Sequence, residues 1–402
     1  MSGPAVLVHT QLPTVKPSSP RYSDASSWVW VPCLEFPIER VNRLQFSSKP
    51  LKWIRYCIGA VTGAQGHLSR KADSLELVDY DQPLSSDSAE SMRLYYHVSD
   101  AEKEHMFPTD PHLADPPKTN SVHSRASTTT SSVACEAFHQ DLCERDTRCV
   151  AIGWDEMYCD AVHLVPHCKD DDYIKTLTTR RCRGREDDIV PAIDDVRNGV
   201  LLQAGLHKLL RQTLAFMPAP NFAMDSSDVV PGADPSEPMC IIHLFEPLQA
   251  FDIAGARLSM PRPATATGKS DWPPPVLFEA VYGAVVLHEF GVEAAHARVT
   301  SVWEDLYYPR GGFEATTAET GLRRRRARAQ RAEAEAEAGG SPPPPTQKPD
   351  SLDLLLLVPY LAIPPNELGQ YVADVERKAK AEERRSAEEK VNKWREGVPS
   401  SS

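Results

Sequence analysis

The sequence lacks the features that mark membrane, secreted and zinc-ribbon proteins. It has no run of about 18 apolar residues, so no membrane span is expected. The N-terminus has no basic segment followed by an apolar run, which predicts a protein that is not secreted. Its 9 cysteines contain no Cys-x-x-Cys pair. In an intracellular chain this pattern predicts free thiols and argues against a disulfide framework or a structural zinc site.

Positive charge is also scarce. The chain has 44 lysine and arginine residues against 56 aspartate and glutamate residues, so its net charge is −12. This balance excludes a general electrostatic attraction to nucleic acid, and any such binding must use a local basic patch. Hydrophobic residues make up 41% of the chain, enough to bury a core. Its 402 residues predict two or three units of about 150 residues, and its 35 prolines argue against a long helical bundle.

The N-terminal part of the chain divides into three segments by composition. Residues 1–27 are polar and rich in proline and serine, which predicts a disordered N-terminus. Residues 28–105 predict a small β-rich domain, and residues 106–132 a polar linker. Three short stretches that are aromatic and β-branched are expected to be strands: Trp28–Val31, Leu51–Tyr56 and Arg93–Val98.

The rest of the chain also divides into three segments. Residues 133–310 predict the main globular domain, followed by a disordered basic and proline-rich linker at 311–350. Residues 351–402 predict a charged helical tail, either a solvated helix or a coiled coil. The arginine-rich run at 323–331 has three interpretations: a solvated helix face, a nuclear-import patch or a nucleic-acid contact.

Two helices are expected within residues 133–310. Ser131 or Ser132 is placed to cap the first, because apolar residues recur at helical spacing after them. The second is Val276–Leu287, whose apolar residues fall on more than one face, so it should pack on two sides. A pair of buried strands is the alternative for this stretch, because it is rich in β-branched residues.

The residues that carry chemistry lie between 149 and 224. Two short stretches, Cys149–Gly153 and Cys159–His167, are joined by a polar turn and predict a β-hairpin. The pair Asn198-Gly199 predicts a later turn. A leucine-rich helix that carries His207 follows this turn. The chain thus places a histidine on a strand, an asparagine in a turn and a histidine on a helix.

This order resembles the HNH nuclease family, and the match looks closest to its fungal branch. The residues on which this resemblance rests are His163, Asn198 and His207, together with the Pro-Asn-Phe-Ala stretch at 220–223. A lead-in of the Arg-Asp-x-x-Cys type adds to the likeness: Arg145, Asp146 and Cys149. The resemblance implies an α+β fold with a ββα-metal core at 149–224.

The resemblance also implies an activity, which is metal-dependent endonuclease hydrolysis of DNA phosphodiester bonds. His163 would be the general base, because a neutral imidazole accepts a proton from water near neutral pH. Asn198 would hold that imidazole in one orientation. His207 would bind one divalent ion, Mg²⁺ or Mn²⁺, and an imidazole ligand also admits Zn²⁺.

Two positions depart from the family pattern. Many members carry an aspartate directly before the strand histidine and another four residues after the helix histidine, where this chain has Val162 and Arg211. Neither side chain is a metal ligand, and Asp160 or His167 could in principle substitute. These departures, with the net acidity, favour an alternative: a catalytically degenerate HNH-fold protein that binds nucleic acid or acts as a scaffold.

Each candidate residue also has a purely structural interpretation. His163 among apolar neighbours is typical of a core histidine, Asn198 of a turn former, and His207 of an interfacial histidine on a leucine-rich helix. His167 is interpreted as a surface residue after the strand. Asp194 is interpreted as solvated or helix-capping.

One basic loop completes the candidate site. It is either a weak phosphate contact or a plain solvated loop, and it comprises Arg180, Arg181, Arg183 and Arg185. The expected partner is nucleic acid, DNA in the first place, bound through a local site without a membrane. The expected location is the nucleus or the cytoplasm.

Overall fold

The computed structural model describes residues 4–15, 19, 24–44, 47–84, 91–114, 129–246, 253–260 and 271–307. All of them belong to one compact unit. A second unit, residues 249–252 and 336–402, lies outside the described residues. The linker predicted at 311–350 and the helical tail predicted at 351–402 lie outside them too.

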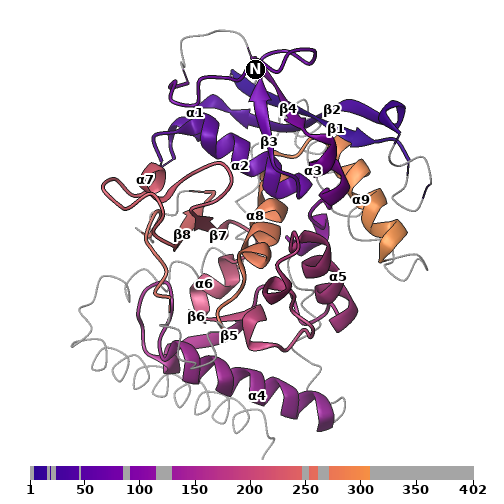
Figure 1. Cartoon of the computed structure of the whole chain (residues 1–402). Coiled ribbons are helices and arrows are strands. Elements are labelled where there is room, and N and C mark those ends of the chain that lie inside the picture. Colours follow the sequence, from indigo (N-terminus) through magenta and orange to yellow (C-terminus); the bar gives the residue numbers. More distant parts are fainter. Residues whose placement is uncertain are drawn as a thin grey trace, which may run out of the picture. The chain divides into compact units, whose positions relative to one another are not determined.

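Helices and sheets are mixed in this unit, which confirms the predicted α+β class. A four-stranded sheet lies at one end and the long helix α8 (Pro275–Phe290) runs through the middle (Figure 1). Helix α4 (Thr129–Asp146) and strands β5 (Cys159–His163) and β6 (Gly199–Gln203) lie at the other end (Figure 1). No helix in the described part of the chain is long and apolar enough to cross a membrane.

The four-stranded sheet has the order β2-β1-β4-β3, with β1 antiparallel to β2 and parallel to β4. Its strands are β1 (Ala5–Pro13), β2 (Trp28–Pro37), β3 (Gly66–Ser69) and β4 (Met92–Val98). The predicted strands at 28–31 and 93–98 are therefore confirmed. The predicted disorder of residues 1–27 is wrong for β1, an inner strand of the sheet. Its buried residues Val6, Val8 and Leu12 fall at every second position, as is typical of a strand. The polar and proline-rich composition of residues 1–27 as a whole hides this alternation.

The stretch Leu51–Tyr56 is helical, so the prediction of a strand there is wrong. It belongs to α2 (Pro50–Thr62), which begins with proline at its first position and ends before Gly63 at φ 73°. These are the preferred residues at the two ends of a helix. The aromatic residues that suggested a strand serve instead to fill a core between elements.

That core lies where α2 packs against α8. The predicted helix at 276–287 is confirmed, and α8 is buried on nearly all sides. The Nε1 of Trp53 donates to the hydroxyl of Tyr282 at 2.6 Å, and this hydroxyl lies 2.7 Å from Nδ1 of His243 on strand β8 (Met239–Leu244). Gly283 lets the two helices approach, because a Cβ there would lie 2.4 Å from the carbonyl oxygen of Ala60.

Short elements complete the unit. The predicted helix after residue 132 is confirmed by α4, but Ser131 and Ser132 lie inside it and do not cap it, because α4 begins at Thr129. The remaining helices are α1 (Ile38–Asn42), α3 (Asp100–His105), α5 (Asp171–Arg181), α6 (Ala204–Leu209), α7 (Ser226–Val229) and α9 (Glu293–Leu306). Strand β7 (Leu214–Ala219) pairs with β8. The 3-10 turns are η1 (Ala25–Ser27), η2 (Pro111–Leu113), η4 (Glu156–Tyr158), η5 (Glu186–Asp188) and η6 (Val196–Asn198).

The predicted hairpin between residues 149–153 and 159–167 is wrong. Strand β5 pairs instead with β6, and His163 lies opposite Gly199. Residues 149–153 form a turn, and the amide of Val150 donates to the carbonyl of Leu201 at 3.0 Å. The short spacing between the two stretches suggested a hairpin. The partner of β5 is instead β6, which lies farther along the chain and is buried throughout.

The prediction of a polar linker at 106–132 is wrong at both of its described ends. Residues 106–114 pack into the core, where Met106, Phe107 and Leu113 are buried, and residues 129–132 belong to α4.

Residues from both sides of this range also pack together. The guanidinium of Arg40 pairs with Glu289 at 2.8 Å. The ammonium of Lys52 pairs with Asp228 at 2.7 Å. The N-terminal sheet and the segment that contains α8 therefore share one core.

We expect Gly283→Ala to lower the free energy of unfolding by about 1–3 kcal/mol, because the new methyl group would collide with the backbone of α2. Urea unfolding of the full chain measures this. His288→Ala, on the exposed face of the same helix, is the matched control and should change little. Equal stability of the two variants would contradict the close approach of α2 and α8.

Candidate functional site at the end of strand β5

The imidazole of His163 lies between an aromatic ring and a carboxylate. It stacks on Phe138 of α4 at a centroid distance of 3.9 Å and an interplanar angle of 9°. Its Nε2 donates to Oδ1 of Asp194 at 2.9 Å, because a carboxylate accepts hydrogen bonds and the ring must supply the proton. Its Nδ1 has no hydrogen-bond partner among the described residues. The stacked ring and the carboxylate together fix the orientation of the imidazole, whose side chain is 12% exposed.

Burial lowers the pKa of His163 from 6.5 to about 4. The carboxylate of Asp194 opposes this change, whereas His167 and Arg211 add to it. The imidazole is therefore neutral near pH 7 and holds a lone pair on Nδ1. A neutral, oriented imidazole is able to accept a proton from water.

Asp194 and His167 complete this cluster, and the sequence offered His167 only as a substitute metal ligand and did not assign Asp194 to the site. The Nε2 of His167 lies 3.5 Å from the same carboxylate oxygen of Asp194, and the two imidazole rings are 5.5 Å apart. His167 is half-exposed, as expected of a surface residue. The sequence gives one indication that Asp194 lies at this site. Asp194 is four residues before Asn198-Gly199, and Gly199 lies opposite His163 when β5 pairs with β6.

Asn198 does not touch the imidazole, so the prediction that its amide orients His163 is wrong. Its side chain is fully buried and tied to backbone groups. The Oδ1 accepts from the amide of Val165 at 2.9 Å, and Nδ2 donates to the carbonyls of Val165 and Ile193 at 3.0 and 2.8 Å. These bonds fasten the turn that carries Asp194 to the chain that leaves β5. Asn198 therefore positions the carboxylate that orients the imidazole.

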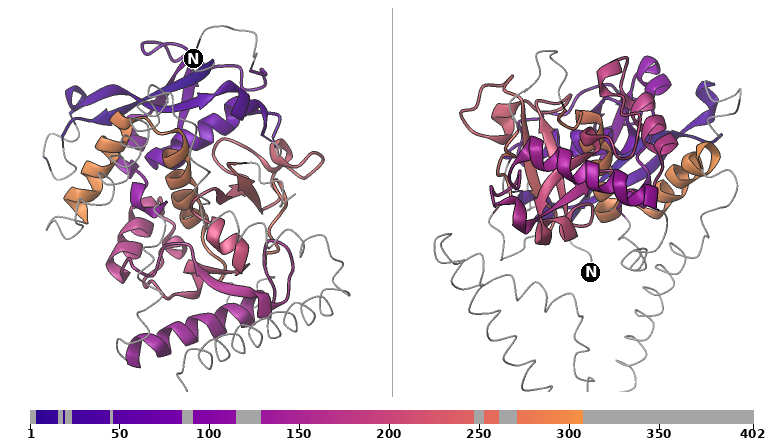
Figure 2. Two further views of the ribbon diagram at one scale, coloured as in Figure 1. Left: turned by 180° about the vertical axis from the view of Figure 1, so that it is seen from behind. Right: turned by 90° about the horizontal axis from the view of Figure 1, so that it is seen from below.

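His207 lies apart from His163. Side chains alternate along β5, so His163 projects from one face and Asp160 from the other. The Nδ1 of His207 on α6 donates to Oδ2 of Asp160 at 2.8 Å, which places it with the second face. Figures 1 and 2 show α4 on one side of the two strands and α6 on the other. The three predicted residues thus do not converge on one cleft.

The donor set does not fit the single shared ion that the resemblance implies. No group of three or more histidine, cysteine, aspartate or glutamate side chains is arranged to hold a metal within the described ranges. Asp160 and His207 offer two donors, and their nearest polar atoms are bonded to each other. Val162, at the position of an expected ligand, is buried in the core.

The Arg-Asp-x-x-Cys lead-in is structural. Arg145 pairs with Asp146 at 2.6 Å and donates to the carbonyls of Val196 and Gly199, both at 2.8 Å. Asp146 in turn accepts from the amide of Leu201 at 2.8 Å. This buried pair clamps the end of α4 onto β6 and so holds Phe138 against His163.

The predicted phosphate-binding role of the basic loop is wrong for Arg181, which is buried, and it stays a prediction for Arg183 and Arg185, which pair with acidic residues of the chain. Arg181 is buried and donates to the carbonyls of Phe107 and Ala60 at 2.9 and 2.8 Å. Arg183 pairs with Glu102 at 2.7 Å, and Arg185 with Asp188 at 2.8 Å. Arg180 is exposed at the end of α5, so its part in phosphate binding stays a prediction.

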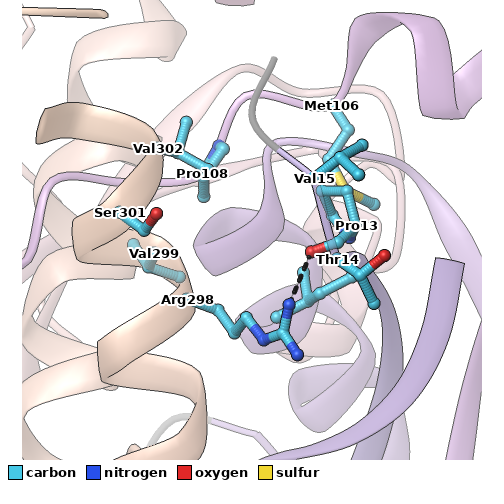
Figure 3. Close-up of a pocket in the computed structure, with 10 residues that line it drawn as sticks. Pro13, Thr14, Val15, Met106, Pro108, Arg298, Val299, Ser301 and Val302 are labelled. Carbon is cyan, nitrogen blue, oxygen red and sulfur yellow. Dashed lines mark hydrogen bonds between the residues drawn. The ribbon is translucent and has the colours of Figure 1, made fainter. Parts of the chain in front are cut away.

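A small pocket of about 60 Å³ lies away from this site, between β1 and α9 (Figure 3). Arg298 donates to the carbonyl of Pro13 at 3.1 Å across it, and Thr14 and Ser301 add the other polar side chains (Figure 3). Its lining includes no histidine, cysteine or acidic residue. It therefore offers no group for acid–base chemistry.

Residues 149–215 match the model of a family described as HNH endonuclease. The match includes β5, β6 and α6, and it is a minority of the chain. It confirms the resemblance seen in the sequence: this segment is similar to the HNH nuclease family. The fungal branch stays a prediction. Searches of curated proteins and of solved structures found no match.

We expect Asn198→Ala to lower the free energy of unfolding by about 2–5 kcal/mol, because it leaves three buried backbone groups without partners. Urea unfolding of the full chain measures this. Asn42→Ala, at an exposed position of α1, is the control and should be near neutral. A loss below about 1 kcal/mol would mean that the turn is held by other contacts.

His163 should titrate near pH 4. Since the unfolded chain takes up this proton near pH 6.5 and the native chain does not, the free energy of unfolding should fall by up to about 3 kcal/mol as the pH drops through that window. Ring NMR resonances give the pKa, and unfolding at pH 7 and pH 4.5 gives the stability. His163→Gln should remove this part of the acid sensitivity. Asp194→Asn should lower the pKa of His163 further, and a rise instead would contradict the assigned contact.

Proposed function

We propose that this protein is an HNH-type nuclease that hydrolyses phosphodiester bonds of nucleic acid, with DNA as the expected substrate. The observation that carries the proposal is the His163–Asp194 pair, which lies within the segment that matches the HNH endonuclease family. In this proposal β5, β6 and α6 are the counterpart of the family's ββα-metal unit. His163 is its general base.

The proposed reaction starts at the free nitrogen of His163. Nδ1 takes a proton from a water molecule, whose oxygen attacks the phosphorus atom. The bond from phosphorus to the leaving nucleoside oxygen breaks, and this oxygen takes a proton from solvent. The imidazolium then returns its proton to solvent, so the site is restored.

Asp194 and Asn198 act through His163 in this scheme. The carboxylate of Asp194 holds the ring and stabilises the imidazolium that forms during the reaction. The amide of Asn198 keeps Asp194 in reach by fastening the turn that carries it. Both are positioning residues, and only His163 meets the attacking water.

A second function has specific support. Val162 and Arg211 stand where the resemblance implies metal ligands, and the donors that remain do not form a metal site among the described residues. A chain of this kind is also consistent with a degenerate HNH fold that binds nucleic acid without cutting it. The proposed reaction is therefore tested with and without added divalent ions.

We expect the full chain to nick supercoiled plasmid DNA and His163→Ala to nick it at least about 100-fold more slowly, since general-base catalysis commonly contributes that much. The assay is run with Mg²⁺, with Mn²⁺, with Zn²⁺ and with a chelator. His288→Ala, at an exposed position far along the chain, is the control and should retain the wild-type rate. His207→Ala should lose less activity than His163→Ala, because His207 lies with the other strand face.

Equal nicking by wild type and His163→Ala would overturn the assignment of the base. If the wild type binds a fluorescent DNA duplex but cuts none of the substrates, the second function holds instead. Circular dichroism of each variant shows whether the fold is retained.

A further inference from the structure

Arg211 is held in an unusual place at the end of α6. Its backbone lies in the left-handed region at φ 70°, which costs a residue other than glycine of the order of 1 kcal/mol. The residue is only 7% exposed. Its amide donates to the carbonyl of Leu214 at 2.9 Å, which closes the turn between α6 and β7. The chain therefore keeps a strained arginine buried where a smaller residue would fit the backbone better.

The guanidinium of Arg211 has no acidic partner among the described residues. Its one hydrogen bond goes from Nη1 to the carbonyl of His163, at a long 3.4 Å. Other buried arginines are better satisfied: Arg145 pairs with Asp146, and Arg181 donates to two carbonyls at below 3.0 Å. The Nε and Nη2 of Arg211 have no hydrogen-bond partner among the described residues, and neither atom is shut off from solvent. An anion that enters here is therefore able to accept from them.

The charge persists under physiological conditions. Burial lowers the pKa of Arg211 to about 10, with a smaller opposing effect from Cys168, so the group stays protonated near pH 7. It also lies close enough to the imidazole of His163 to lower its pKa. A cation with free donors and a neutral base thus lie at the same end of β5.

We propose that Arg211 binds the non-bridging oxygens of the phosphate on which His163 acts. This inference rests on the proposed function and adds the group that recognises the substrate. The planar guanidinium presents paired N–H donors that match two oxygens of a tetrahedral anion. Arg211 supplies positive charge at an end of the strand pair where the described side chains offer no metal site.

The test uses the full chain and two probes: sulfate, which keeps its double charge where His163 titrates, and the dinucleotide TpT, which has a single phosphodiester. Isothermal titration gives the affinities, and ring NMR resonances of His163 report whether the anion lies at the site. The variants are Arg211→Gln and Arg211→Lys. Arg257→Gln, a surface arginine paired with Glu237, is the matched control.

Both probes should bind the wild type, shift the resonances of His163 and raise its pKa. Arg211→Gln should weaken both affinities by about tenfold or more, as expected for the loss of charge-assisted hydrogen bonds. Arg211→Lys should lose less, because it keeps the charge but not the paired donors. Arg257→Gln should bind as the wild type does.

Unchanged binding in Arg211→Gln would overturn the inference, and so would unmoved His163 resonances in the wild type. Binding of sulfate without TpT would overturn the assignment to a phosphodiester. If circular dichroism shows that Arg211→Gln does not fold, Arg211→Lys and the wild-type resonances decide. Since none of these readouts requires turnover, a wild type that never cuts DNA would sink the proposed function and leave this inference standing.

Discussion

The candidate site depends on the buried amide of Asn198. Three hydrogen bonds to main-chain groups of Val165 and Ile193 fasten the turn before β6 to the chain that leaves β5. The carboxylate of Asp194 sits in that turn, so its contact with His163 follows from the amide. A fully buried amide left with unpaired partners is expensive, and this cost keeps the turn in one conformation. The site is thus oriented by main-chain geometry more than by direct contacts among its functional side chains.

The second support of the site is α4. The pair of Arg145 and Asp146 ties the end of this helix to β6, and Gly199 leaves the room that Phe138 needs. A Cβ on Gly199 would lie 2.4 Å from the ring of Phe138. The resulting burial of His163 has an electrostatic consequence, since desolvation is the largest cause of its lowered pKa. The packing of α4 against His163 therefore helps to keep this imidazole neutral.

A two-stranded sheet separates two histidine–aspartate pairs. His163 with Asp194 lies on the α4 side, where it stacks on Phe138, and His207 of α6 with Asp160 lies on the other. The alternation of side chains along β5 makes this unavoidable, because Asp160 and His163 differ by an odd number of positions. Arg211 adds a positive charge at this end of β5, because its guanidinium reaches the carbonyl of His163.

Sequence alone determined the α+β class, the strands at 28–31 and 93–98, and the segment similar to HNH nucleases, because periodicity and motif order are local properties. It left a helix or a pair of strands open at 276–287, and the packing of α8 decided for the helix. It did not determine that α2 is a helix or that β1 is an inner strand, since burial against distant residues outweighs the local composition. Only the tertiary structure decided which groups meet His163. Asp194 reaches it through the β5–β6 pairing, and Arg211 through the turn after α6. Those contacts join positions tens of residues apart, and no local pattern encodes a distance between them.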